Sequence, residues 1–119
     1  MKRKIQEFNY IWIDWLNLNV YWSISSIEDF EQTFKKEFGV FPDIGESNGG
    51  KFFSVPRESQ RIGVIWIRKP FKFQILAHEC FHCVHWIAQE RGMRLDDSSE
   101  EIYAYLLQYL ISRINEYKR

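Results

Sequence analysis

The chain is poor in the residues that cross-link, rigidify or charge a small protein. Its 119 residues include two cysteines and three prolines, and 16 Lys and Arg residues balance 16 Asp and Glu residues. The two cysteines, Cys80 and Cys83, do not make a disulfide framework, so a hydrophobic core has to hold the fold together. Because the charges balance, no electrostatic attraction draws the chain to nucleic acid or to an acidic membrane. We therefore expect no nucleic-acid partner.

The chain also lacks a long hydrophobic run. Positions 2–4 are basic, as at the start of a signal peptide, but polar residues interrupt the stretch that follows, over positions 6–19. No segment approaches the roughly 18 apolar residues that a membrane span needs. We therefore expect a cytoplasmic protein that does not associate with membranes. Since the chain contains no repeat, linker or low-complexity tract, we expect one domain over residues 1–119.

Aromatic residues are abundant, at 18% of the chain, and they shape the expected N-terminal structure. Apolar and aromatic residues recur at alternate positions over 7–24, which predicts one long strand or a hairpin that turns near positions 17–19. Ser25, with Glu28 three residues later, predicts a capping box at the start of a helix. Gly39 is expected to end this helix.

The rest of the chain predicts two strands followed by two helices. The strands are expected at residues 51–55 and 61–67, and the helices at residues 71–91 and 100–116. Together with the N-terminal elements, this order predicts an α+β fold, in which helices pack on a small antiparallel sheet.

The first of these long helices carries a His-Glu-x-x-His pattern. Residues four apart lie about 40° from each other around a helix axis, so His78 and His82 share one face and can bind a single Zn²⁺ ion at about 2.1 Å. Glu79 lies on the flank of that face, where its carboxylate can reach a metal-bound water without being a ligand. The pattern predicts a zinc site with Glu79 as the general base. The competing interpretation is two partly buried histidines and an exposed glutamate.

Other chemically active residues lie on the same helix. His85 falls on the metal face but lies about 10.5 Å along the axis from His78, too far for both to bind one ion on a straight helix. We expect His85 to line the cleft or to act in the second layer around the metal, with a plain surface position as the alternative. Cys80 and Cys83 project from the side turned away from the metal, so buried packing is favoured over redox chemistry or metal binding.

A catalytic zinc needs a third protein ligand, and the last helix offers acidic candidates. A short loop at residues 92–99 would fold this helix back antiparallel and bring its first turn near the motif. The candidates are Asp96, Asp97, Glu100 and Glu101.

The sequence argues both ways between the last two candidates. Glu100 falls in the apolar arc of the helix with Leu107 and Ile111, where a buried carboxylate would need a compensating charge such as a metal ion. Glu101 lies at the boundary of that arc. With Ser98 it also forms the pattern of a capping box, which would use the carboxylate without any metal.

Two segments of the chain resemble the gluzincin type of zinc metallopeptidase, and more closely small phage and prophage proteins that carry the same helix. They are residues 76–82, which contain the motif, and residues 97–106. In gluzincins the third ligand is a Glu followed three residues later by a small residue, and Glu101 with Ala104 fits that spacing. The next position, usually Asp, is Tyr105 here. The resemblance implies a minimal zincin-like fold, Glu101 as the third ligand and peptide-bond hydrolysis, in the host cytoplasm if a phage encodes the chain.

We expect a zinc-dependent peptidase that acts on a peptide or protein substrate. An extended substrate would pair with the edge of the 61–67 strand, and Tyr103, Tyr105 or His85 would stabilise the oxyanion. The alternative is a catalytically silent metal-binding protein with an interaction or regulatory role, whose aromatic residues would supply a partner surface. A metal-free helical scaffold is the third interpretation.

Overall fold

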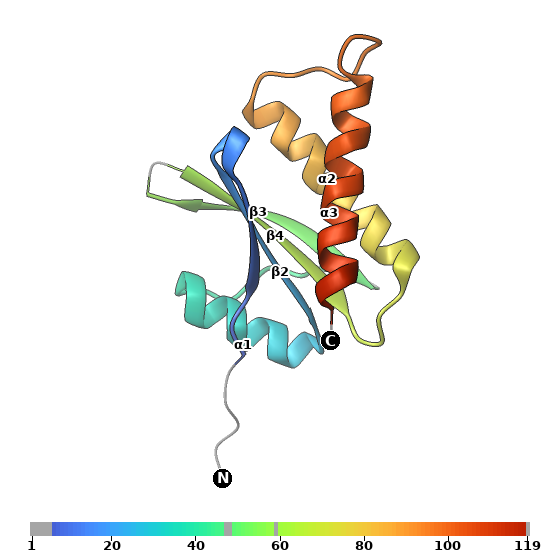
Figure 1. The fold of residues 1–119 in the computed structure, drawn as a ribbon. Coiled ribbons are helices and arrows are strands. Elements are labelled where there is room, and N and C mark those ends of the chain that lie inside the picture. Colours follow the sequence, from blue (N-terminus) through green and yellow to red (C-terminus); the bar gives the residue numbers. More distant parts are fainter. Residues whose placement is uncertain (1–5, 47–48, 59, 119) are drawn as a thin grey trace.

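The computed structural model describes residues 6–46, 49–58 and 60–118. A four-stranded sheet lies between one helix on one face and two helices on the other (Figure 1), which confirms the α+β class. In chain order the elements are β1 (Asn9–Ile13), a 3₁₀ turn (Asp14–Leu16), β2 (Leu18–Ser25), α1 (Ile27–Phe38), β3 (Gly50–Arg57), β4 (Gln60–Arg68), α2 (Phe73–Glu90) and α3 (Glu100–Tyr117).

The strands lie in the order β1-β2-β4-β3, with antiparallel pairs at both edges and a parallel pair in the centre. The expected antiparallel sheet is therefore wrong at the β2–β4 pair, where Val20 lies beside Gly63 and Ser25 beside Arg68. The reason is a crossover: α1 and β3 lie between these strands in the sequence and return the chain to the end at which β2 began. The 61–67 segment, expected at an edge, is interior, and β3 is an edge strand instead.

The N-terminal aromatic segment forms a hairpin, one of its two expected forms. β1 pairs with β2 along its whole length, and the chain reverses through the 3₁₀ turn. Asn17 follows in the left-handed region with a φ of 53°, which Asn tolerates better than most residues. Its N–H donates to the Asp14 carbonyl at 3.2 Å. The reversal therefore begins slightly earlier than expected.

The N-cap of α1 differs by one residue from the expected cap. Ser26 caps the helix, because its hydroxyl accepts a hydrogen bond from the backbone N–H of Asp29 at 3.1 Å. Ser25 ends β2 instead, and its buried hydroxyl lies 2.8 Å from that of Ser23. Gly39 ends the helix with a φ of 81°, as expected.

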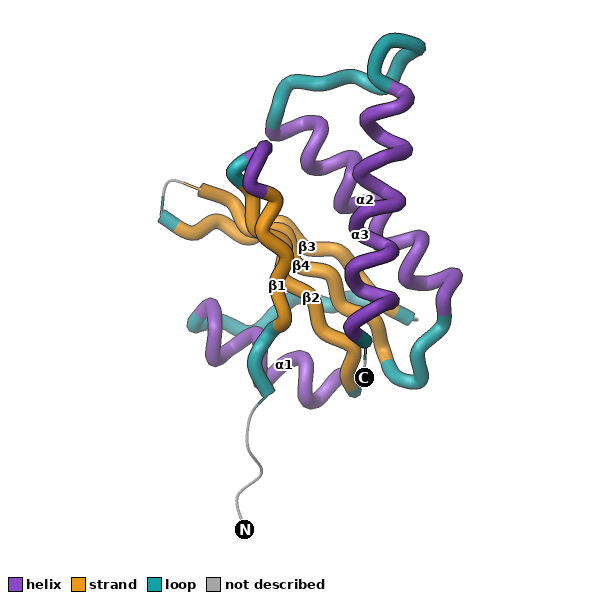
Figure 2. The backbone as a smooth tube through the Cα atoms, in the orientation of Figure 1, coloured by secondary structure: helices purple, strands orange, loops and turns teal. Residues whose placement is uncertain are grey.

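Each face of the sheet has its own hydrophobic core. α1 covers one face, and α2 with α3 covers the other (Figures 1 and 2). Aromatic rings dominate the core under α1, where Phe30 and Trp66 stack with ring centres 5.0 Å apart. The core under α2 and α3 is largely aliphatic, and its buried residues include Ile11, Val20, Ile65, Ile67, Leu76, Ile87, Leu106 and Leu110. Because successive strand residues point to opposite faces, one strand contributes side chains to both cores.

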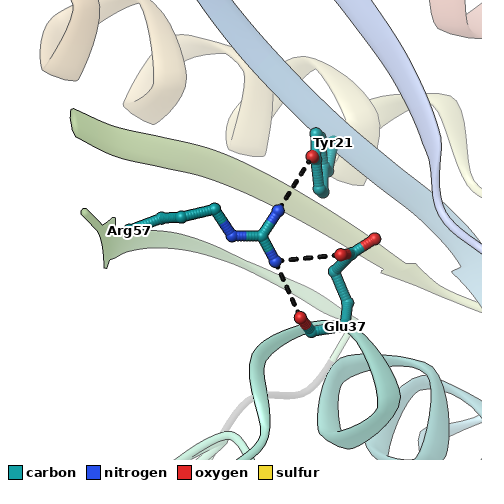
Figure 3. A network of polar contacts seen from close by, with 3 residues as sticks. All are labelled: Tyr21, Glu37 and Arg57. Carbon is teal, nitrogen blue, oxygen red and sulfur yellow. Dashed lines mark hydrogen bonds and ion pairs between the residues drawn. The ribbon is translucent and has the colours of Figure 1, made fainter. Parts of the chain in front are cut away.

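Arg57, at the end of β3, ties the sheet to α1 (Figure 3). Its guanidinium donates to the Tyr21 hydroxyl at 3.2 Å, to the Glu37 carboxylate at 2.9 Å and to the Glu37 carbonyl at 2.7 Å. The same group lies 4.8 Å from the centre of the Phe38 ring. These contacts hold one end of the edge strand in place.

The two long helices, α2 and α3, lie side by side and run in opposite directions (Figure 1). Each has 18 residues, with bounds close to the expected ones. The chain leaves α2 through a turn in which the N–H of Met93 donates to the Ala88 carbonyl at 2.8 Å. None of the helices in the described ranges combines the length and apolarity needed to span a bilayer.

Candidate metal centre

A cavity of about 970 Å³ lies between α2 and β3, and all three histidines of the chain line it. His78, His82 and His85 line it from α2, together with Glu79, and Phe52 lines it from β3. The residues of the motif therefore lie beside an edge strand of the sheet.

The pattern of burial along α2 explains why the histidines face this cavity. His78, His82 and His85 are exposed, whereas one broad side of the helix is buried against the sheet and α3. A helix with such an apolar side is oriented by it, so the polar stripe has to face outward. The buried side includes Leu76, Cys80, Cys83, Val84 and Ile87.

The two motif histidines point their rings at each other. Their Nε2 atoms lie 3.2 Å apart, and the rings are inclined by 76° with centres 4.8 Å apart. Two nitrogens that each lie about 2.1 Å from one tetrahedral zinc are separated by about 3.4 Å. The pair therefore fits two adjacent positions of a zinc site, although a hydrogen bond between two imidazoles has a similar length.

Glu79 is buried, with 7% of its surface exposed, and turns toward β3. Burial raises the pKa of its carboxyl group, because the charged form loses its water. Smaller influences lower the pKa: the charges of His78 and His82, a hydrogen bond from the backbone N–H of Phe52, and the charge of Lys51. The sequence did not predict this burial, since a flank position on an isolated helix is open to solvent.

Gly50, the first residue of β3, permits the close approach of that strand to α2. A Cβ atom at Gly50 would lie 2.5 Å from the Trp66 carbonyl oxygen, 3.0 Å from Cγ2 of Ile75 and 3.4 Å from Cγ of Glu79. A side chain at this position would collide with the neighbouring strand and crowd the carboxylate. The local sequence signal for this close approach is the Gly49-Gly50 pair at the start of the strand.

The two cysteines are free thiols in the core, as expected from their side of the helix. Burial raises the pKa of the Cys80 thiol to about 12, and the nearby Glu79 charge adds to this effect. Burial also raises the pKa of the Cys83 thiol well above its usual value. Both sulfurs therefore stay protonated thiols at neutral pH, and neither lines the cavity that contains the histidines.

The structure does not bring α3 to the histidine pair. Glu100 and Glu101 are exposed on its first turn, Tyr105 is 65% exposed, and Tyr103 is buried in the core. No residue of α3 lines the cavity. Within the described ranges, no group of three or more His, Cys, Asp or Glu side chains is placed to hold a metal ion. The ligand role of Glu101 thus stays a prediction, and so does the role of Tyr105 at the oxyanion.

Two features explain this placement of α3. The helix begins beyond the C-terminal end of α2, and the motif lies in the middle of α2 (Figure 1). Moreover, α3 buries Tyr103, Leu106, Leu110 and Ile114, which is not the arc around Glu100 that the helical wheel favoured. The expected capping box is absent as well, because no side chain caps α3. Instead the Asp96 carboxylate accepts hydrogen bonds from the Ser98 and Ser99 backbone N–H groups at 2.9 and 3.1 Å.

Comparison of the chain with protein-family models, with curated proteins and with solved structures finds no match.

Proposed function

We propose that the chain is a zinc-dependent hydrolase that cleaves peptide bonds, with His78 and His82 as metal ligands and Glu79 as the general base. One observation carries the proposal. The Nε2 atoms of His78 and His82 lie 3.2 Å apart at a cavity, and the buried carboxylate of Glu79 lines the same cavity. Two exposed histidines four residues apart can both point into solvent without approaching each other. Two ligands of one metal ion have to approach each other, and the rings of His78 and His82 do so.

The chemistry follows from the positions of these groups. A zinc ion held by His78 and His82 would supply a bound water whose pKa falls toward about 7. The Glu79 carboxylate would accept a proton from that water and later deliver it to the leaving amine. The Phe52 N–H orients this carboxylate from the β3 side before any substrate arrives. His85 lines the same cavity and would donate a hydrogen bond to the developing oxyanion.

The position of β3 favours an extended peptide as the substrate. β3 pairs with β4 on one side and forms an edge of the sheet, and the cavity with the histidines lies beside it. A peptide laid along this edge would make backbone hydrogen bonds to β3 and pass over the motif. This replaces the substrate strand expected at 61–67, which is interior.

Hydrolysis by the zinc-loaded chain tests the proposal. Wild-type protein should cleave members of a random peptide pool, detected by mass spectrometry, and a chelator should stop the cleavage. Glu79→Gln should keep the zinc and lose the cleavage, because the amide cannot accept the proton. The matched control is Glu90→Gln, which changes an exposed carboxylate on the same helix and should keep both properties. Full activity in Glu79→Gln would contradict the base role.

A second function is favoured by the lack of a third acidic or histidine ligand near the pair within the described ranges. A catalytic zinc takes three protein ligands and a water, so a site built from the two histidines alone lacks one of the ligands that hydrolysis needs. The same experiment separates the two functions. A chain that binds zinc through His78 and His82 but cleaves no peptide in the pool would support the silent metal-binding protein.

A further inference from the structure

A second cavity, of about 380 Å³, lies between the start of β1 and the end of α3. Asn9 and Ile11 line it from β1, Trp22 from β2, and Arg113 and Tyr117 from α3. It shares no residue with the cavity at the histidine pair. The strand order explains the separation, because β1 and β3 are the two opposite edges of the sheet.

The Arg113 guanidinium rests on aromatic rings but has no polar partner among the residues that the structure describes. It lies 5.2 Å from the centre of the Tyr117 ring and 6.0 Å from that of Tyr109. Its Nε atom is buried and makes no hydrogen bond, and the ion pairs found among the described residues do not include it. A buried charged N–H group without an acceptor is costly and rare in folded proteins. Because Nε itself is closed to solvent, an acceptor from outside the chain would meet the two Nη atoms of the guanidinium, to which no described residue is hydrogen-bonded.

The outer edge of β1 runs beside this guanidinium. β1 pairs with β2 on one side, and no strand of the described ranges covers its other side. Such an edge carries backbone N–H and C=O groups that can pair with an added strand. Tyr10 and Trp12, 68% and 46% exposed, stand on the face of β1 opposite the α3 side. An added strand would cover part of this apolar surface.

We propose that the β1 edge binds an extended peptide segment that carries an acidic side chain. The segment adds to the sheet beside β1 through backbone hydrogen bonds. Its carboxylate accepts two parallel hydrogen bonds from the Arg113 fork, a geometry that guanidinium and carboxylate share. The Tyr117 ring, which lines the cavity and is 55% exposed, offers the apolar surface against which the carbon chain of the acidic residue lies. The preference for an acidic segment follows from the positive charge of Arg113, which lacks a counter-charge among the described residues.

Two peptide pools test this proposal with the full chain. The probes are blocked peptides of about seven residues, the length of an ordinary strand, randomised except for a central glutamate in one pool and a central glutamine in the other. A chelator is present throughout, so the result does not depend on any metal at the histidines. Immobilised wild-type protein should retain the glutamate pool about tenfold better than the glutamine pool, as counted by mass spectrometry.

Substitutions at Arg113 connect this preference to the guanidinium. Arg113→Gln should remove the preference, and Arg113→Lys, which keeps the charge and loses the fork, should reduce it by about threefold or more. Arg61→Gln changes an exposed arginine on β4 and should leave it intact. If Arg113→Gln does not fold, as judged by its thermal transition, the lysine variant carries the test. Equal retention of the two pools, an unchanged preference in Arg113→Lys, or dimerisation through β1 without peptide retention would overturn the proposal.

Discussion

Gly63 on β4 lies directly under the indole ring of Trp86 on α2, so close that a Cβ atom at residue 63 would come within 2.7 Å of Cζ3 of that ring. The Phe52 ring of β3 packs against the same indole, with centres 5.7 Å apart. Trp86 is buried and lines the cavity that contains the histidines. The absence of a side chain at Gly63 therefore sets how near the motif helix lies to the sheet.

Gly63→Ala should destabilise the protein. The added methyl group has to displace Trp86, and such overpacking of a core costs about 1–3 kcal/mol. The change should lower the midpoint of urea denaturation without changing the slope. Gly92→Ala is the contrasting variant: its Cβ would meet nothing within 4 Å, and its φ of 67° brings only backbone strain, worth about 1–2 kcal/mol. Gly63→Ala as stable as wild type would show that α2 shifts freely over the sheet.

Removal of the Arg57 side chain should lower the free energy of unfolding by less than the number of its hydrogen bonds suggests. Arg57→Ala loses the contacts to Glu37 and Tyr21, but the Arg57 and Glu37 side chains are 33% and 38% exposed, so water replaces much of the interaction. We expect a loss of about 1 kcal/mol in the free energy of unfolding, and a smaller loss at high salt. In the control Lys36→Ala, the contact with Glu7 is 3.6 Å long with side chains 49% and 80% exposed, so stability should stay within about 0.5 kcal/mol of wild type. If Arg57→Ala loses no more stability than Lys36→Ala, the network in Figure 3 does not hold β3 in place.

How far the sequence predicts this fold depends on the range of the interactions. The helix that contains His78 and His82 was predicted within two residues at each end, because caps and apolar spacing are local. The parallel pairing of Val20 with Gly63 was missed, since it joins strands 43 residues apart and no local pattern encodes it.

The candidate site shows the same limit. Helical spacing correctly placed His78, His82 and His85 on one exposed stripe. The burial of Glu79 comes from β3, a neighbour that the helix pattern does not contain. A helical wheel for α3 tells which residues share a side of the helix, but not which side packs against α2. The side that is buried in the structure does not include Glu101, so this residue does not lie beside the motif.

Both thiols should be inert in the folded protein. Because burial raises the pKa of Cys80 to about 12 and raises that of Cys83 well above its usual value, neither forms a reactive thiolate at pH 8. Ellman's reagent should react with both thiols only after urea unfolds the chain. Rapid reaction of either thiol in the native protein would contradict the packing of α2 against its core.

The same shift makes a contribution to the pH dependence of stability. The folded-state pKa of Cys80 is raised above the ordinary thiol value of 9.0, so its contribution is fully present below pH 9 and is lost as the pH rises toward 12. Cys80→Ala should show a smaller loss of stability over that alkaline range than wild type, measured by urea denaturation at a series of pH values. An identical pH profile for the two proteins would contradict the shift.

The zinc content of the purified chain and its histidine variants is the most direct test of the proposed metal centre. Elemental analysis after dialysis against metal-free buffer should find one zinc per wild-type chain. His82→Ala should lose the metal, because one of the two converging Nε2 atoms is gone. His85→Ala removes a histidine that lines the same cavity and should keep one zinc per chain. Equal zinc in wild type and His82→Ala, or none in wild type loaded with excess zinc, would contradict the account.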